Sequence, residues 1–143
     1  MLPAKIHCMK KQLFLLTFLT ILGGSYIIAQ SSAIPSEIAL AFRAGNVEKL
    51  SEYLNSTVEL VILEKEDFYK KSIAETILKD FFRDHQTLEF IIKHQGGKND
   101  AHYAIGSLKT RNGNFRVYFL VKRVDSKPLI HQLRIEKDGT ESN

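Results

Sequence analysis

The sequence contains almost no cysteine, since Cys8 is the only one among its 143 residues. One thiol cannot form an intramolecular disulfide, so the fold must be held by an apolar core rather than by covalent cross-links. Cys8 also precedes the apolar run at residues 13–23, whereas a lipoprotein cysteine would follow it. The sequence therefore supports neither disulfide stabilisation nor lipidation.

Motifs for metal binding and for nucleophilic catalysis are missing as well. The histidines show no His-x-His or His-x-x-x-His spacing and no Cys/His spacing, which leaves out the usual patterns of zinc ligands. Ser107 lacks an evident base and the G-x-S-x-G context of a nucleophile elbow. We therefore expect no metal, no cofactor and no catalytic residue that a motif identifies.

Net charge is small once the N-terminal segment is set apart. Residues 1–29 have the order of a secretory signal peptide: a positive start with Lys5, Lys10 and Lys11, an apolar run at 13–23, then small and polar residues. The whole chain has 20 basic and 16 acidic residues, so removing these three lysines leaves 17 basic residues against 16 acidic ones. This balance argues against a nucleic-acid-binding protein.

We expect residues 1–29 to be a signal peptide and residues 30–143 to form one exported domain, either periplasmic or secreted. Cleavage is predicted after Ala29, with Ala33 as the alternative site. Residues 13–29 are only just long enough to span a bilayer, so an uncleaved anchor is the alternative interpretation. After cleavage, no stable membrane association is expected.

Hydrophobic periodicity predicts helices in the first half of this domain. Residues 37–54 fit a helix, a tight bend and a second short helix, with Gly45 ending the first and Asn46 capping the second. A longer helix with a broad apolar stripe is predicted to begin at an S-x-x-E capping box that starts with Ser72 and to continue to about Asp84.

Strands are predicted around and after that helix. Residues 57–63 alternate as a strand, and the segment 64–71 is interpreted as a polar connection. Four antiparallel strands follow the helix, separated by a QGGKND break, an Asn-Gly hairpin turn and a turn before Pro128: residues 88–94, 102–110, 114–123 and 129–137. Helices followed by strands predict an α+β fold, with the N-terminal helices packed on a curved antiparallel sheet.

Five segments carry a family resemblance: AFRAGNVEKLSEYL (41–54), VELVI (58–62), SIAETILKDFF (72–82), HQGG (94–97) and YAIGSLKTRNGNFRVYFLVKR (103–123). Together they resemble the nuclear transport factor 2-like (cystatin-like) superfamily, and in detail a family of small exported bacterial domains of unknown function. The resemblance covers residues 34–138 and implies a cone-shaped fold, but it includes no catalytic motif. In this superfamily the cone holds a pocket in some members, and in others the sheet face or the pocket mouth binds a partner.

A pocket inside such a cone would be lined by inward-facing side chains. By strand parity, His94 and His131 fall with the apolar residues of their strands, so both imidazoles are candidates to point inward. Tyr53 and Tyr103 are candidate hydrogen-bond donors to a ligand. The alternatives are solvated histidines near strand ends and packed tyrosine rings with hydrated hydroxyls. The complete set of pocket candidates is His94, His131, Tyr53, Tyr103, Phe81 and Phe119.

Carboxylates are missing from the inward positions of the predicted strands. Glu89 and Glu136 alternate with the apolar residues, and Asp80 and Asp84 lie near a helix end where solvent reaches them. A ketosteroid isomerase-like enzyme needs an acid in an apolar pocket. The sequence thus favours a non-catalytic domain that binds a small apolar ligand or a protein partner, and a small isomerase- or dehydratase-like enzyme is the alternative.

The strand after the Asn-Gly turn is predicted to have one buried and one outer face. The outer face contains Arg116, Tyr118, Leu120 and Lys122. Residues 85–143 contain ten basic and six acidic side chains, whereas residues 34–84 contain seven and ten, and such polarity suits contact between copies. We therefore predict a homodimer through this outer sheet face. A fully solvated face is the alternative.

Overall fold

The computed structural model describes residues 33–139, which all belong to one compact unit, Ser32–Asn143. The predicted signal peptide, the cleavage site after Ala29 and Cys8 lie outside the described residues. Within residues 33–139, no helix combines the length and the apolar character that crossing a membrane requires.

The described region contains three helices: α2 (Ser36–Ala44), α3 (Val47–Ser51) and α4 (Lys71–Asp84). Gly45 ends α2 in the left-handed conformation, with φ of 60°. The side chain of Asn46 caps α3 by accepting a hydrogen bond from the backbone amide of Lys49 at 3.0 Å. These two helix boundaries confirm the predicted helix–bend–helix segment.

The capping box predicted at Ser72 was wrong. The N-cap residue of α4 is Lys70, and no side chain caps this end of the helix. Ser72 lies inside the first turn, where its carbonyl accepts a hydrogen bond from the Thr76 hydroxyl at 3.1 Å. Because a paired strand runs up to Lys70, the end of strand pairing fixes the start of α4.

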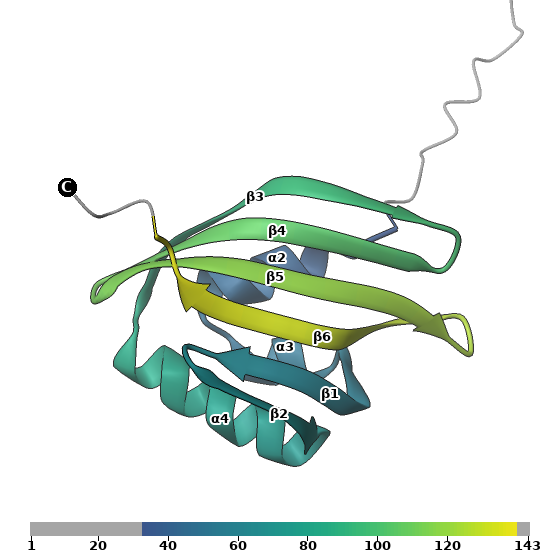
Figure 1. The fold of residues 1–143 in the computed structure, drawn as a ribbon, viewed down its shortest axis with the longest axis horizontal. Coiled ribbons are helices and arrows are strands. Elements are labelled where there is room, and N and C mark those ends of the chain that lie inside the picture. The colour runs from purple at the N-terminus through teal and green to yellow at the C-terminus, as the bar shows by residue number, and fades with distance from the viewer. Residues whose placement is uncertain (1–32, 140–143) are drawn as a thin grey trace, which may run out of the picture. The chain divides into compact units, whose positions relative to one another are not determined.

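Six strands form one sheet in the order β2-β1-β6-β5-β4-β3 (Figure 1). Their bounds are β1 Leu54–Ile62, β2 Lys65–Lys70, β3 Thr87–Lys98, β4 Ala101–Thr110, β5 Gly113–Val124 and β6 Lys127–Lys137. β3 to β6 are antiparallel neighbours, as predicted. β1 pairs in parallel with β6, so the sheet is mixed rather than wholly antiparallel.

Strand β2 lies where the sequence predicted a polar connection. It pairs antiparallel with β1 along its whole length, from Thr57 opposite Lys70 to Ile62 opposite Lys65. Most of its side chains are exposed, as is usual for an edge strand, so it lacks the apolar alternation that reveals other strands.

The predicted break at residues 95–100 was also wrong, because β3 continues to Lys98 and turns only at Asn99 and Asp100. Gly96 and Gly97 stay paired with Tyr103 and His102 of β4. Pairing with a long neighbouring strand therefore overrides the local preference of glycine for turns.

The helices cover one face of the sheet, with α2 against β3 and α4 against β1 and β2 (Figure 1). On this face the ring of Phe42 stacks between Phe90, at 4.8 Å between centroids, and Phe119, at 5.9 Å. All three rings are buried. Gly106 lies under Phe90 so closely that a Cβ there would be 2.5 Å from the ring. The space beneath β3, β4 and β5 is therefore filled by side chains.

Candidate functional site

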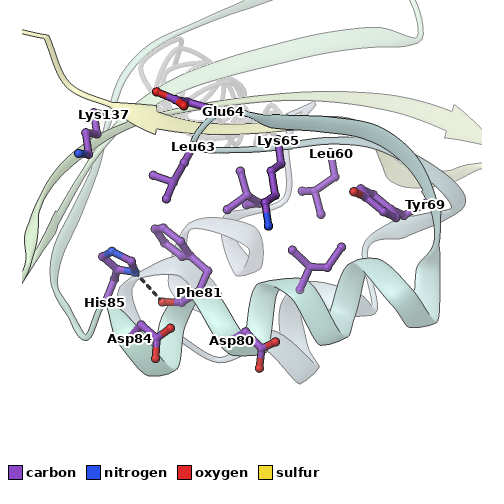
Figure 2. A pocket seen from close by; sticks show the side chains of 12 residues that line it. Leu60, Leu63, Glu64, Lys65, Tyr69, Asp80, Phe81, Asp84, His85 and Lys137 are labelled. Carbon is purple, nitrogen blue, oxygen red and sulfur yellow. Dashed lines mark hydrogen bonds between the residues drawn. The ribbon is translucent and has the colours of Figure 1, made fainter.

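A cavity of about 880 Å³ lies between α4, the β1–β2 hairpin and the end of β6 (Figure 2). Such a volume falls within the range of sites that hold small ligands, about 300–1,000 Å³. Its lining residues are Leu60, Ile62, Leu63, Glu64, Lys65, Tyr69, Ile77, Asp80, Phe81, Asp84, His85 and Lys137. The cavity thus lies on the same helix-covered face of the sheet as the phenylalanine stack, but toward the β2 edge rather than the β3 edge.

The walls of the cavity are mostly apolar. Leu60 and Ile62 come from the helix-covered face of β1, and Ile77 and Phe81 come from the apolar stripe of α4. Leu60 and Phe81 are buried within the core cluster, while Ile62 and Ile77 pack against it and remain half-buried. Apolar walls of this kind favour a ligand with a hydrocarbon or ring body.

Leu63 lines the cavity from the turn between β1 and β2, and its backbone conformation is unusual. Its φ is 58°, in the left-handed region that non-glycine residues rarely adopt. The amide of Leu63 donates a hydrogen bond to the carbonyl of Ile135 on β6 at 2.8 Å, which fixes the turn. Backbone of this kind concentrates at ligand clamps, where surrounding contacts maintain it.

Two polar side chains enter the cavity from β2. Lys65 pairs with Ile62 and Tyr69 pairs with Val58, so both lie on the helix-covered face of the sheet. Figure 2 shows the amino group of Lys65 and the hydroxyl of Tyr69 directed into the space between β1 and α4. A cation and a hydroxyl therefore meet the apolar walls at one side of the cavity.

His85 borders the cavity at the C-terminal end of α4. Its Nδ1 lies 3.0 Å from the carbonyl of Phe81, and because a carbonyl only accepts, Nδ1 carries the proton in this bond. The imidazole stacks on the ring of Phe81 at 4.4 Å and meets the edge of Phe115 at 5.1 Å. These contacts fix the orientation of the imidazole ring. In a neutral imidazole with the proton on Nδ1, Nε2 is a hydrogen-bond acceptor.

The carboxylates of the lining do not point into the cavity. Asp80 and Asp84 both bind Arg83, at 3.0 and 3.2 Å, and Figure 2 shows them turned away from the cavity on the far side of α4. Glu64 is exposed on the hairpin turn. The described residues contain no group of three side chains arranged to hold a metal ion.

Among the six predicted pocket residues, the structure places Phe81 in the cavity wall. Phe119 is fully buried in the ring stack. Tyr53 lies just after α3, near Glu37 and Glu52. Burial is the main cause that raises the pKa of its hydroxyl, and the two carboxylates raise it further. Tyr103 stacks with Tyr118 on the outer face of the sheet, at 6.2 Å between ring centroids.

The expected inward orientation of His94 was wrong, and a β-bulge also interrupts the alternation on which the expectation for His131 rested. β3 shifts register between Ile92 and His94, and His94 is exposed. On β6 the bulge opposite Leu120 and Val121 leaves His131 without a cross-strand partner, so Ile130 takes the buried position. A bulge reverses side-chain parity, and sequence alternation alone does not locate it.

His131 is half-buried at this bulge, and its Nε2 is buried without a hydrogen-bond partner among residues 33–139. Burial, and secondarily the nearby ammonium of Lys122, lower the pKa of His131 below its usual range. These surroundings therefore favour the neutral form of the imidazole.

Phe81 is the one lining residue that the sequence analysis proposed for a pocket, and the polar lining residues that it missed include Lys65, Tyr69 and His85. Lys65 and Tyr69 were missed because the segment that contains them has no apolar alternation and was not assigned to a strand. Pairing that segment with β1 through a two-residue turn would have placed both side chains on the inner face. His85 follows the predicted helix, but no local signal says which side of the helix end it occupies.

The outer sheet face matches the prediction for β5. Phe115, Val117, Phe119 and Val121 are buried on one side, and Arg116, Tyr118, Leu120 and Lys122 lie on the other. Tyr118 and Leu120 are only half-buried, and the hydroxyl of Tyr103 lies 3.0 Å from where a Cβ of Gly96 would be. The Tyr103 ring therefore lies flat across β3, and the outer face presents an aromatic surface.

Comparison with known proteins identifies close relatives. The pattern of the family described as Domain of unknown function (DUF4783) matches residues 35–136. A DUF4783 family protein from Bacteroides ovatus is 35% identical with a TM-score of 0.73, covering 76% of this chain and 99% of that chain. Another, from Bacteroides fragilis, is 39% identical with a TM-score of 0.70, covering 73% and 99%. No curated protein matches.

More distant crystal structures share the fold alone. A domain of unknown function with a cystatin-like fold from Nostoc punctiforme is 11% identical with a TM-score of 0.60, covering 74% of each chain. A protein of the NTF2-like family from Streptomyces avermitilis is 10% identical with a TM-score of 0.55, covering 72% of this chain and 89% of that one. These likenesses confirm the predicted α+β cone, with an NTF2-like, cystatin-like fold.

Proposed function

We propose that this chain, which belongs to the DUF4783 family of domains of unknown function and has an NTF2-like fold, is a binding domain for a small apolar ligand. The ligand enters the cavity between α4 and the β1–β2 hairpin. One observation carries the proposal: a space of about 880 Å³ with mostly apolar walls lies open beside the buried apolar core. Such a space is a typical ligand site.

The orientation of the carboxylates supports binding rather than proton-transfer catalysis. Catalytic acids of small isomerases sit in apolar surroundings that raise their pKa and bring them within reach of the substrate. Here Asp80 and Asp84 are exposed and bound to Arg83, on the side of α4 that faces away from the cavity. A bound ligand therefore meets apolar walls and the groups of β2.

The alternative, a small isomerase- or dehydratase-like enzyme, is favoured by one observation: His85 and Tyr69 both border the cavity. Proton abstraction next to a carbonyl would exchange the α-protons of octan-2-one for deuterium in D₂O, which NMR follows directly. The binding proposal predicts no acceleration of this exchange by the protein. Acceleration that His85→Gln removes would establish the enzyme instead.

Binding is tested by filling the cavity. Ile77 lies half-buried on the wall, so Ile77→Trp reduces the space without disturbing the packed core. Leu40→Trp is the matched control, because Leu40 is 54% exposed on α2 and does not line the cavity. In calorimetric titrations with octan-1-ol, we expect saturable binding to the wild type and to Leu40→Trp, and none to Ile77→Trp. Binding that survives Ile77→Trp contradicts the proposed site.

We also propose that the outer sheet face forms a homodimer. Tyr103, Tyr118 and Leu120 give this face an apolar centre, and Ile91 adds a 39% exposed side chain on β3. Glu59 and Glu66 lie toward the β1–β2 side of the sheet, whereas Arg116 and Lys122 lie on β5. A two-fold arrangement would bring the acidic side of one copy against the basic side of the other.

The dimer is tested by light scattering coupled to size exclusion. Tyr118→Glu places a charge in the centre of the proposed interface and should yield a monomer. Leu40→Glu changes an exposed apolar residue on α2 and should leave the dimer intact. A wild-type protein that stays monomeric as concentration rises would reject the proposal.

We propose that the domain acts outside the cytoplasm, after removal of residues 1–29. The support is the order of charge, apolar run and small residues in the N-terminal segment. N-terminal sequencing of the protein from fractionated cells should find Gln30 as the first residue. An intact Met1 on a membrane-bound product would instead establish the uncleaved anchor.

A further inference from the structure

We infer that the ligand of the cavity is an amphipathic monoanion, an apolar body with one carboxylate-like head that Lys65 holds. This inference rests on the proposed function of the cavity and adds the chemical class of its ligand. It follows from which polar groups point into the cavity and from which partners those groups already have.

Lys65 is a cation without a partner at the cavity. Its position opposite Ile62 places it on the inner face of the sheet, and Figure 2 shows its amino group over the cavity. No carboxylate of residues 33–139 forms an ion pair with it, whereas Lys79 and Arg134 on nearby elements are each paired with two carboxylates. The ammonium of Lys65 is therefore available to an anion from outside.

The acids that border the cavity do not neutralise this ammonium. Asp80 and Asp84 share the guanidinium of Arg83 on the outer side of α4. Glu64 is exposed on the turn, and Lys137 adds a second basic side chain to the lining at the end of β6. Asp67 shares the inner face of β2 with Lys65, but it does not line the cavity, and its carboxylate accepts a hydrogen bond from the amide of Phe68 at 2.7 Å. Among the charged residues of the lining, Figure 2 shows Lys65 directed into the cavity, whereas Asp80 and Asp84 point away from it.

Tyr69 lies farther along the same inner face of β2, four residues from Lys65, and its hydroxyl points into the cavity in Figure 2. At about 3.3 Å per residue, the backbones of these two residues are about 13 Å apart. The Tyr69 hydroxyl is therefore separate from the head-group site, which is the ammonium of Lys65. A hydrogen bond from this ammonium to a carboxylate is charge-assisted and stronger than one between neutral groups.

The remaining walls select the rest of the ligand. Leu60 lies beside Lys65 on the sheet side of the cavity, and Ile77 and Phe81 face it from α4. None of these three offers a hydrogen-bonding side chain. A molecule charged along its whole length would lose hydration there without compensation. A single anionic head followed by an apolar body satisfies both sides of the cavity.

Octanoate and octan-1-ol separate this inference from the binding proposal, because they share a chain and differ in the head group. In calorimetric titrations of the purified protein, we expect octanoate to bind about tenfold more tightly than octan-1-ol. Lys65→Met keeps the length and apolar stem of the side chain while removing the charge. This variant should reduce octanoate affinity to that of the alcohol.

Lys70→Met is the matched control on the same strand. Lys70 is exposed and pairs with Thr57, so it lies on the opposite face from Lys65. We expect this variant to bind both compounds like the wild type. Equal affinities for the two compounds, or a preference that Lys65→Met preserves, overturn the inference and leave the binding proposal intact. Absence of binding by both compounds overturns both.

Discussion

The space between the helices and the sheet differs from one side to the other. Under β3, β4 and β5 it is filled by the stacked rings of Phe42, Phe90 and Phe119. Under β1 and β2 it remains open as a cavity of about 880 Å³. The two regions share one sheet and one layer of helices, so the difference lies in the side chains that each strand directs inward.

Strands β5 and β2 illustrate the difference. β5 directs an apolar side chain inward at every second residue, and all of them are buried. β2 directs Lys65, Asp67 and Tyr69 toward the same face, and it is an edge strand with no further strand beside it. Stability is thus concentrated under the central strands, and the polar edge strand leaves room for a ligand.

The largest effect is expected from removing a ring of the filled region. Phe119→Ala should lower the free energy of unfolding by about 3–5 kcal/mol, because it leaves a cavity in packed surroundings. Ile77→Ala, on the wall of the open region, should cost about 1 kcal/mol, because its side chain is only half-buried. Urea unfolding measures both. Equal costs would show that the two regions are packed alike.

A second test adds volume to the filled region. A methyl group at Gly106 would be 2.5 Å from the ring of Phe90, which Phe42 holds in place. Gly106→Ala should therefore destabilise the fold by about 1–3 kcal/mol. Gly139→Ala is the control, since nothing lies within 4 Å of its added methyl. Equal midpoints of thermal unfolding for the two variants would contradict the close packing.

The filled region was largely predictable from sequence, because its signals are local. Gly45, Asn46 and the Asn-Gly turn fix element ends through their own backbone preferences. Alternation along β5 identified the buried and outer faces correctly. Each of these features depends on residues close together in the chain.

The open region was not predictable, because it depends on pairings between distant segments. The parallel pairing of β1 with β6 and the antiparallel pairing of polar β2 leave no periodic trace. Alternation also fails outside the open region, at the bulges near His94 on β3 and His131 on β6. The sequence therefore supplied Phe81 to the cavity but not Lys65, Tyr69 or His85.

A third test concerns the hairpin turn over the cavity. Leu63→Gly should relieve the left-handed backbone, worth about 1–2 kcal/mol, while losing apolar contacts of similar size. We therefore expect little change in the urea midpoint but weaker binding of octan-1-ol. Unchanged binding would remove Leu63 from the site.

The smallest effect is expected from His131 on β6, the strand between the two regions. Burial first and then Lys122 lower its native pKa below the value of about 6.5 for an unfolded chain. As the pH falls below about 6.5, the unfolded state takes up a proton that the native state does not, so stability decreases toward the lower native pKa. His131→Gln should flatten this part of the curve of unfolding free energy against pH. A slope unchanged by the substitution would contradict the shift.

The contrast between a filled and an open region is tested most directly by NMR. Backbone amide shifts are recorded while octan-1-ol is added to the ¹⁵N-labelled protein. We predict that the largest changes fall on residues 60–69 of the hairpin and 77–85 of α4, with little change at Phe42, Phe90 or Phe119. Changes centred on the phenylalanine stack, or on Tyr103 and Tyr118 of the outer face, would contradict the proposed site.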